Sequence, residues 1–137
     1  MIESFNGTFL FIFYLLNLGG GAYYAYQSVL TTEKFLSNYG IHQSALLPTR
    51  LAGSFVLATV LLGVYILFRG PEGTWSYFVI LFLQSLIFCV LGYVSVTYSA
   101  AAKLEGVKYT AEAYIAPAIF TIINGVLIYG LSDKIYM

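Results

Sequence analysis

Charged side chains are scarce in this sequence. Only 9% of its 137 residues are Asp, Glu, Lys or Arg, whereas soluble domains carry about 25%. Six basic residues balance six acidic ones, so the net charge is zero. Nucleic-acid binding depends on basic side chains that neutralise phosphates. The composition therefore excludes an ordinary soluble domain, and it gives no basis for a nucleic-acid partner.

Cysteine and histidine are almost absent as well. A single cysteine, Cys89, excludes an internal disulfide. A protein metal site needs three or four N, S or O ligands, and the one histidine, His42, has no ligand at a recognisable spacing. Motifs of the GxSxG, HExxH and GxGxxG kinds are missing too. We expect no metal site and no catalytic residue, which leaves enzymatic activity undecided but favours a non-enzymatic protein.

Apolar residues, in contrast, make up 60% of the chain. They gather in four charge-free stretches, and each is close to or above the roughly 20 residues that a helix needs to cross the hydrocarbon core of a bilayer. The stretches are continuous and lack the alternation of barrel strands. The sequence therefore predicts one all-α integral membrane domain, an antiparallel four-transmembrane-helix bundle with spans at about residues 5–28, 51–68, 75–101 and 113–131.

Two connections bear on the arrangement of the spans. The turn at residues 69–73 is short, so we expect the second and third spans to be antiparallel neighbours. Residues 27–46 mix apolar and polar side chains. This segment is consistent with a helical extension, with a short interfacial helix between the first two spans, or with an ordinary loop.

Small residues recur on the predicted spans at helical spacing. In membranes such residues let helix backbones approach closely. Pro117 is expected to kink or loosen the first turns of the last span. The residues assigned to helix packing are Gly20, Gly21, Gly53, Ser85, Gly92 and Gly125.

Five polar side chains are the candidates for contact with a ligand or a partner. The amides of Asn17, Gln84 and Asn124 lie within the spans, where they either bond between helices or line a small polar pocket. Arg50 stands at the start of the second span, as a cation for an anionic ligand, lipid headgroup or partner, or as a snorkelling anchor. His42 is either a proton carrier or a polar loop residue.

Basic residues indicate the sidedness of the chain, and aromatic residues near both ends of the spans are consistent with aromatic belts at two membrane–water interfaces. With four spans, both termini lie on the same side. The long loops hold more basic residues than the termini and the short turn, so the long loops are predicted to be cytoplasmic and the termini non-cytoplasmic. The first set is Lys34, Arg50, Lys103 and Lys108, and the second is Arg69 and Lys134.

The stretch TRLAGSFVLATVLLGVYIL, with Arg50 and Gly53 at its start and Gly63 further along, gives the chain a familiar outline. Together with the short turn and the two helices that follow, it resembles the DoxX-like group of small four-helix integral membrane proteins. The resemblance implies a four-helix membrane fold. Some members of that group are linked to quinone-reducing membrane complexes. The resemblance implies no catalytic motif in this chain, and the one position that it matches at a possible site is Arg50.

These observations lead to one functional expectation and one alternative. We expect a non-enzymatic accessory or structural subunit of a larger membrane complex or oligomer, whose partners are lipids, other membrane subunits or further copies of itself. The alternative is a lipid- or quinone-binding membrane protein with a pocket near Arg50, Asn17 and Gln84. No cofactor is expected other than such a bound lipid or quinone.

Overall fold

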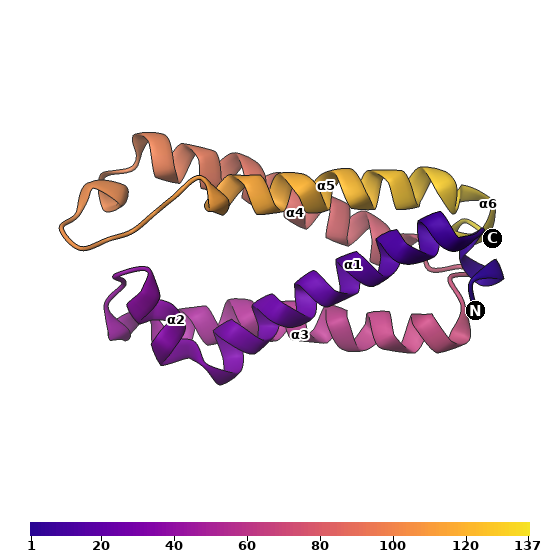
Figure 1. Cartoon of the computed structure of the whole chain (residues 1–137), viewed down its shortest axis with the longest axis horizontal. Coiled ribbons are helices and arrows are strands. Elements are labelled where there is room, and N and C mark those ends of the chain that lie inside the picture. The colour runs from indigo at the N-terminus through magenta and orange to yellow at the C-terminus, as the bar shows by residue number, and fades with distance from the viewer.

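The computed structural model describes residues 1–137 and contains helices but no strands (Figure 1). Four helices are long and two are short, and brief 3-10 turns lie between some of them. The long helices are α1 (Thr8–Ala25), α3 (Leu46–Arg69), α4 (Trp75–Tyr98) and α5 (Glu112–Gly130), and the short ones are α2 (Thr32–Asn38) and α6 (Ser132–Ile135). The prediction of an all-helical chain with four long apolar helices is confirmed.

The helix ends differ from the prediction where local chemistry decides them. Helix α3 begins at Leu46 rather than at residue 51. It includes Pro48, which a first turn tolerates because the N–H groups there have no helical partner. Helix α4 ends at Tyr98, because Ser99 is extended and its hydroxyl accepts a hydrogen bond from the Ala101 N–H.

The segment between the first two spans is mostly helical. Helix α1 continues as a π-helical stretch over Tyr26–Leu30, and the separate helix α2 follows after a break at Thr31. Hydroxyl groups support this stretch, since Ser28 donates to the Tyr24 carbonyl and Thr32 to the Ser28 carbonyl. The structure thus contains both a helical extension and a short helix in place of a simple loop.

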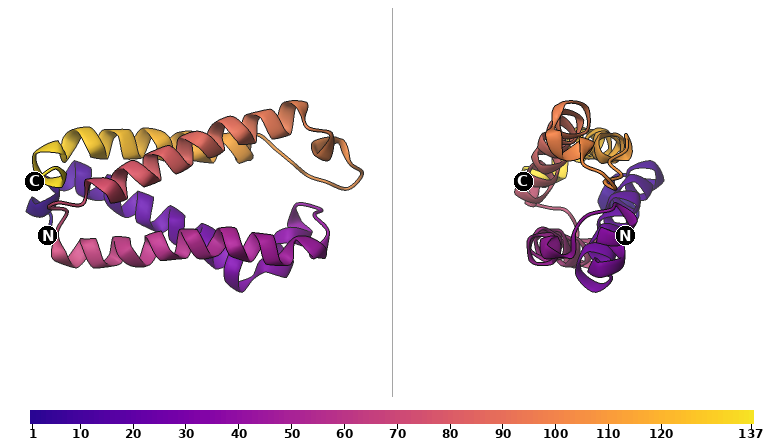
Figure 2. Two further views of the ribbon diagram at one scale, coloured as in Figure 1. Left: turned by 180° about the vertical axis from the view of Figure 1, so that it is seen from behind. Right: turned by 90° about the vertical axis from the view of Figure 1, so that its left-hand side faces the viewer.

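Helix α1 connects the two halves of the molecule (Figures 1 and 2). It starts beside the end of α5, where the Asn6 amide donates to the Gly130 carbonyl. It ends beside the start of α3, where Ser28 and Val29 lie against Gly53. Helices α4 and α5 pack on each other along their length in opposite directions. The bundle is therefore two antiparallel pairs, α1 with α3 and α4 with α5, and α1 also packs on α5.

The second and third spans were expected to be antiparallel neighbours, and the structure shows α3 and α4 in contact only near their turn. The turn at residues 70–74 holds their ends together, and Tyr77 reaches Gly63 near that turn. Beyond this contact the two helices diverge (Figure 2). A short turn constrains only one end of a helix pair, and here α3 packs on α1 and α4 on α5.

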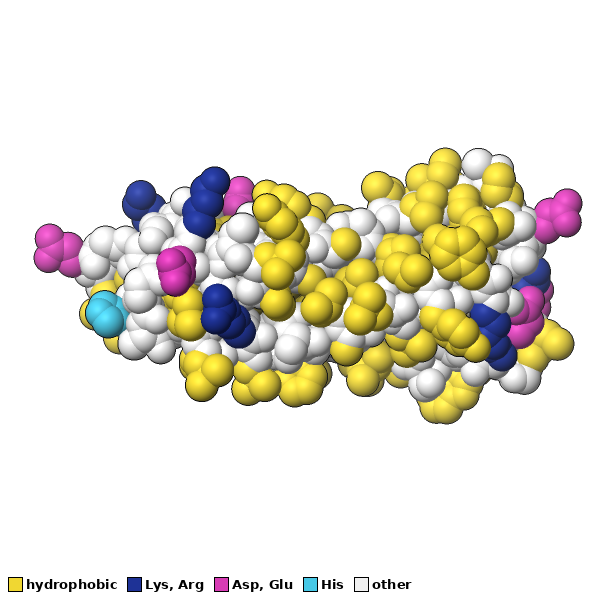
Figure 3. Space-filling view, turned by 90° about the horizontal axis from the view of Figure 1, so that it is seen from below, with side chains coloured by type: hydrophobic (Ala, Val, Ile, Leu, Met, Phe, Trp, Pro, Cys, Tyr) yellow, Lys and Arg dark blue, Asp and Glu magenta, His cyan; other side chains and the backbone are white.

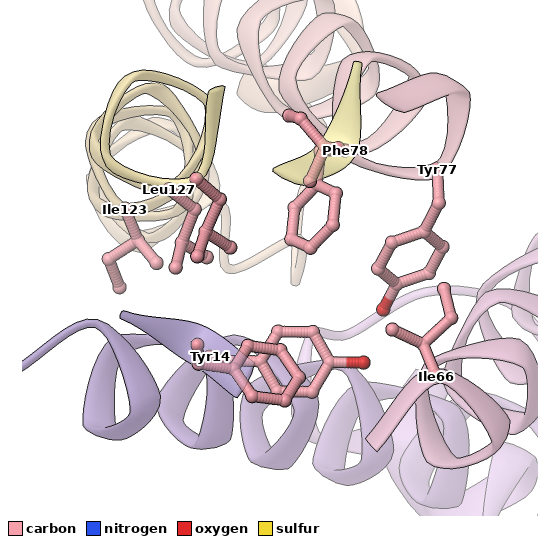
Figure 4. Packing of buried hydrophobic residues seen from close by; sticks show 9 residues of the cluster. Tyr14, Ile66, Tyr77, Phe78, Ile123 and Leu127 are labelled. Atoms are coloured by element: carbon pink, nitrogen blue, oxygen red, sulfur yellow. The ribbon is translucent and has the colours of Figure 1, made fainter. Parts of the chain in front are cut away.

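The hydrophobic core lies at the end of the bundle that holds both termini, and Figure 4 shows how its side chains pack. Its aromatic and aliphatic side chains point toward one another from α1, α3, α4 and α5, and the Tyr14 hydroxyl donates to the Gly63 carbonyl. The buried members are Phe5, Tyr14, Ile66, Tyr77, Phe78, Ile123, Leu127, Leu131 and Ile135.

Hydrogen bonds close both ends of the bundle. At the terminal end, the Lys134 ammonium donates to the Glu3 carbonyl, and the Gly73 N–H donates to the Lys134 carbonyl. At the far end, the Lys108 N–H donates to the Tyr39 carbonyl over 2.9 Å. The N-terminus, the C-terminus and the α3–α4 turn consequently share one end (Figure 1).

Charge and apolar surface are separated along the molecule. On the face in Figure 3, Lys, Arg, Asp, Glu and His side chains occur toward the two ends, and apolar side chains cover the middle. All four long helices are long and apolar enough to cross a membrane. These features are typical of a multi-pass membrane protein.

Gly92 tests the packing of α4 on α5. A Cβ atom at Gly92 would overlap the Ala113 carbonyl, a backbone group that Pro117 leaves without its helical N–H partner. We expect Gly92→Ala to lower the free energy of unfolding by about 1–3 kcal/mol. The measurement is SDS-induced unfolding in mixed micelles, followed by circular dichroism.

The matched control is Gly19→Ala, because a Cβ there meets no atom within 4 Å. Alanine favours a helix over glycine by up to about 1 kcal/mol, so this variant should be neutral or stabilised. Equal losses for the two variants would contradict close packing of α4 on α5.

Candidate functional site

Two amides form a reciprocal pair between α1 and α5. Asn17 Nδ2 donates to Asn124 Oδ1 over 3.0 Å, and Asn124 Nδ2 donates to Asn17 Oδ1 over 3.1 Å. Asn124 Nδ2 also bonds to the Phe120 carbonyl. Asn17 is 8% exposed and Asn124 is 1% exposed. The pair is satisfied internally, which is the arrangement that lets polar groups stay inside an apolar bundle.

The helices approach each other closely around this pair. Gly20, one turn after Asn17, lies against the ring of Phe120, so that a Cβ at Gly20 would overlap it. Gly21 lies against Val60 on α3. Helix α1 therefore contacts α5 and α3 through adjacent glycines. Both contacts are close because glycine has no side chain.

Two more of the predicted packing residues also lie at contacts between helical segments. Gly53 is covered by Ser28 of the π-helical stretch, and Gly125 lies against the Phe82 ring of α4. Ser85 is half-buried and returns its hydroxyl to the Leu81 carbonyl of its own helix. Cys89, one turn further on, points to the Tyr114 carbonyl of α5.

Arg50 lies in the second turn of α3, beside α2. Its Nε donates to Thr32 Oγ1 over 3.2 Å, and Thr32 Oγ1 donates to the Ser28 carbonyl over 2.6 Å. This contact orients the stem of the side chain, while the residue remains exposed. The guanidinium nitrogens beyond Nε are thus open to an anionic group at the end of the bundle.

His42 lies on the exposed segment that leads into α3. Its Nδ1 accepts a hydrogen bond from the Ser44 N–H over 3.0 Å and caps the short turn at Gln43–Ala45. No chain of titratable groups connects it to the interior of the bundle. The geometry gives His42 a local role at the start of this turn.

Gln84 is exposed on α4 and makes no hydrogen bond within the chain. It follows Tyr77, which contacts α3, by seven residues, or about two helical turns. Because α3 has diverged from α4 at that level, no helix covers Gln84. Among the amides of the long helices, Asn17 and Asn124 are paired, whereas Gln84 lacks a partner.

The structure does not bring Arg50, Asn17 and Gln84 together around one pocket. Asn17 is buried against α5, Gln84 is exposed on α4, and Arg50 lies at the end of the bundle beside α2. No group of three or more His, Cys, Asp or Glu side chains is arranged to hold a metal ion.

A different recess, not anticipated from the sequence, lies between the π-helical stretch and α3. It has a volume of about 210 Å³, and apolar side chains alone line it. The lining runs from Ala22 to Leu30 on one side, with Leu57 and Val60 on the other. A π-helical stretch displaces the side chains that follow it, and such stretches frequently occur at functional sites. No residue pattern in the sequence signals this recess.

The fold and these contacts define a four-helix protein with the features of a multi-pass membrane protein. Comparison of the chain with models of known families, with curated proteins and with solved structures found no match.

The amide pair gives a direct test of polar coupling between α1 and α5. Asn17→Leu leaves Asn124 without its partner, and Asn124→Leu does the converse. A double-mutant cycle with both changes should show a coupling in the free energy of unfolding between about 0.6 kcal/mol, the average for hydrogen bonds between membrane helices, and about 1.7 kcal/mol, the largest value. SDS unfolding in mixed micelles measures all four proteins, and strictly additive losses would contradict the pairing.

Proposed function

We propose that this chain is a non-enzymatic multi-pass membrane protein that serves as an accessory or structural subunit of a larger membrane complex or oligomer. The main support is the uneven covering of its helices. Among the four candidate spans, α4 and the span that contains α3 have the highest mean hydropathy. Only 6% of the most apolar part of α4 is buried, whereas 17–22% of the corresponding part is buried in the other three spans. A subunit that associates through α4 accounts for this exposed surface.

The use of polar groups supports the same proposal. Asn17 and Asn124 satisfy each other, and the hydroxyl groups of Ser85 and Thr121 bond to their own helices. Asp, Glu, Lys and Arg are absent from the middle of the long helices, where pumps and coupled transporters usually carry such groups. The interior is thus built for packing more than for moving protons or ions.

In the proposed orientation the four long helices cross the membrane as an antiparallel bundle. Both termini and the α3–α4 turn lie at one end of the molecule. The excess of basic residues at the opposite end favours a cytoplasmic position for the long loops. The N- and C-termini are then non-cytoplasmic.

Purification from native membranes in a mild detergent tests this function. We expect the chain to elute at a mass well above that of one copy in its micelle, either with a stoichiometric membrane partner or with further copies of itself. Size-exclusion chromatography with multi-angle light scattering measures the protein mass. A lone monomer with no co-purifying protein would contradict the proposal.

The apolar recess supports a second candidate function, a lipid- or quinone-binding protein of DoxX-like type. The recess is open to the outer surface, and Arg50 lies two turns from Leu57 toward the end of the bundle. An apolar tail in the recess would place a polar or anionic headgroup near the exposed guanidinium. This candidate uses Arg50 without Asn17 or Gln84.

Filling the recess tests the second candidate. Leu57→Trp should occupy it and abolish a stoichiometric small molecule that mass spectrometry detects in lipid and quinone extracts of the purified protein. Arg50→Ala should reduce the same species severalfold. The matched control is Leu62→Trp, which adds the same ring on an exposed side of α3 away from the recess. Extracts of the wild-type protein without an enriched species would overturn this candidate.

A further inference from the structure

The uncovered face of α4 has the pattern of a helix seam. Six exposed residues of α4 recur at alternating spacings of four and three, which places them on one face of the helix, and Gln84 distinguishes this face from the other exposed side of α4. They lie on the side of α4 away from the face that Ser85, Cys89 and Gly92 present to α5. The residues of this α4 seam are Ile80, Gln84, Ile87, Leu91, Val94 and Tyr98.

Gln84 is the one amide in this apolar seam, and it lies close to the middle of the helix. It is the tenth of the 24 residues of α4, about 4 Å from the helix midpoint at 1.5 Å per residue. At that depth no water is present to satisfy the amide, and an unpaired polar group in hydrocarbon is costly. The structure supplies no partner inside the chain, so a partner from outside would remove this cost.

We infer that a second copy of this chain packs on the α4 seam, with the Gln84 side chains of the two copies bonded to each other across a two-fold axis. This inference deepens the proposed function, on which it rests, by naming the partner. An amide carries both donors and an acceptor, so it is complementary to an identical amide. Asn17 and Asn124 pair in this reciprocal manner within the chain.

Membrane insertion favours the same partner. All copies of a multi-pass protein with one topology enter the membrane in the same direction, so the α4 helices of two copies run parallel. With a two-fold axis along the membrane normal, Gln84 of one copy meets Gln84 of the other at equal depth. A single polar residue in an otherwise apolar seam specifies the register and the number of helices.

Disulfide cross-linking in phospholipid vesicles tests the geometry with the full-length protein. In a Cys89→Ser background, Ile87→Cys places a thiol on the seam next to Gln84. We expect mild oxidation to link it into a covalent dimer. Leu86→Cys is the matched control, because it lies at nearly the same depth but off the seam, and it should cross-link at least severalfold more slowly. Equal rates for the two positions would overturn the inference.

The contribution of the amide is measured by energy transfer between labelled copies as the protein is diluted in lipid. Gln84→Leu increases the apolar character of α4, so insertion is retained, and we expect the dimer dissociation constant to rise about threefold to tenfold. Thr97→Val removes an exposed polar group of α4 that lies off the seam, and it should leave the constant unchanged.

The outcomes separate this inference from the proposed function. A wild-type chain that stays monomeric in lipid but co-purifies with a stoichiometric membrane partner would overturn the α4 dimer and leave the accessory-subunit function standing. A dimer that is unaffected by Gln84→Leu and does not link through Ile87→Cys would also overturn the inference, because the copies would then associate through another surface.

Discussion

The satisfaction of polar groups in an apolar medium is the constraint on which the rest of this structure depends. A bilayer offers no water to an unpaired N–H, carbonyl or amide, so each such group has to find a partner inside the protein. The chain meets this requirement with helices, which satisfy the backbone, and with side-chain bonds such as the Asn17–Asn124 pair. Among the amides of the long helices, Gln84 is the one without a partner inside the chain.

Glycines at the helix contacts allow the helices to pack closely while their polar side chains form hydrogen bonds. Gly20 admits the Phe120 ring beside the amide pair, and Gly92 admits the Ala113 carbonyl that Pro117 leaves free. Without side chains at these positions, α1 and α4 approach α5 closely enough for Asn17 to reach Asn124 and for Cys89 to reach Tyr114. The side-chain hydrogen bonds between these helices therefore depend on the close packing that the glycines allow.

The position of the core explains the uneven surface of the molecule. Aromatic side chains such as Tyr14 and Phe78 join all four long helices near the termini (Figure 4). Toward the other end, the two helix pairs separate and are linked mainly through α1 and the contact of Tyr39 with Lys108. This separation leaves the face of α4 that points away from α5 uncovered, and the proposed association with other membrane proteins rests on that exposed face.

The sequence by itself determined that the chain forms four apolar helices long enough to cross a membrane, and it gave their approximate limits. Runs of apolar residues between charges depend only on local composition, so they can be read without a structure. Local chemistry also indicated a helical segment between the first two spans, although it left a loop and an extension open. The π-helical stretch at Tyr26–Leu30 and its apolar recess had no such local signature.

Only the tertiary structure decided which helices are neighbours and which polar groups meet. The short turn after Arg69 suggested that α3 packs along α4, but a turn controls one end of a pair, whereas packing along the whole length selects α5 for α4 and α1 for α3. The sequence could place Asn17, Gln84 and Asn124 at membrane depth, but it could not show which of these amides are paired. Tertiary packing pairs two of these amides and leaves Gln84 exposed, because the direction of a side chain relative to other helices depends on residues far away in the chain.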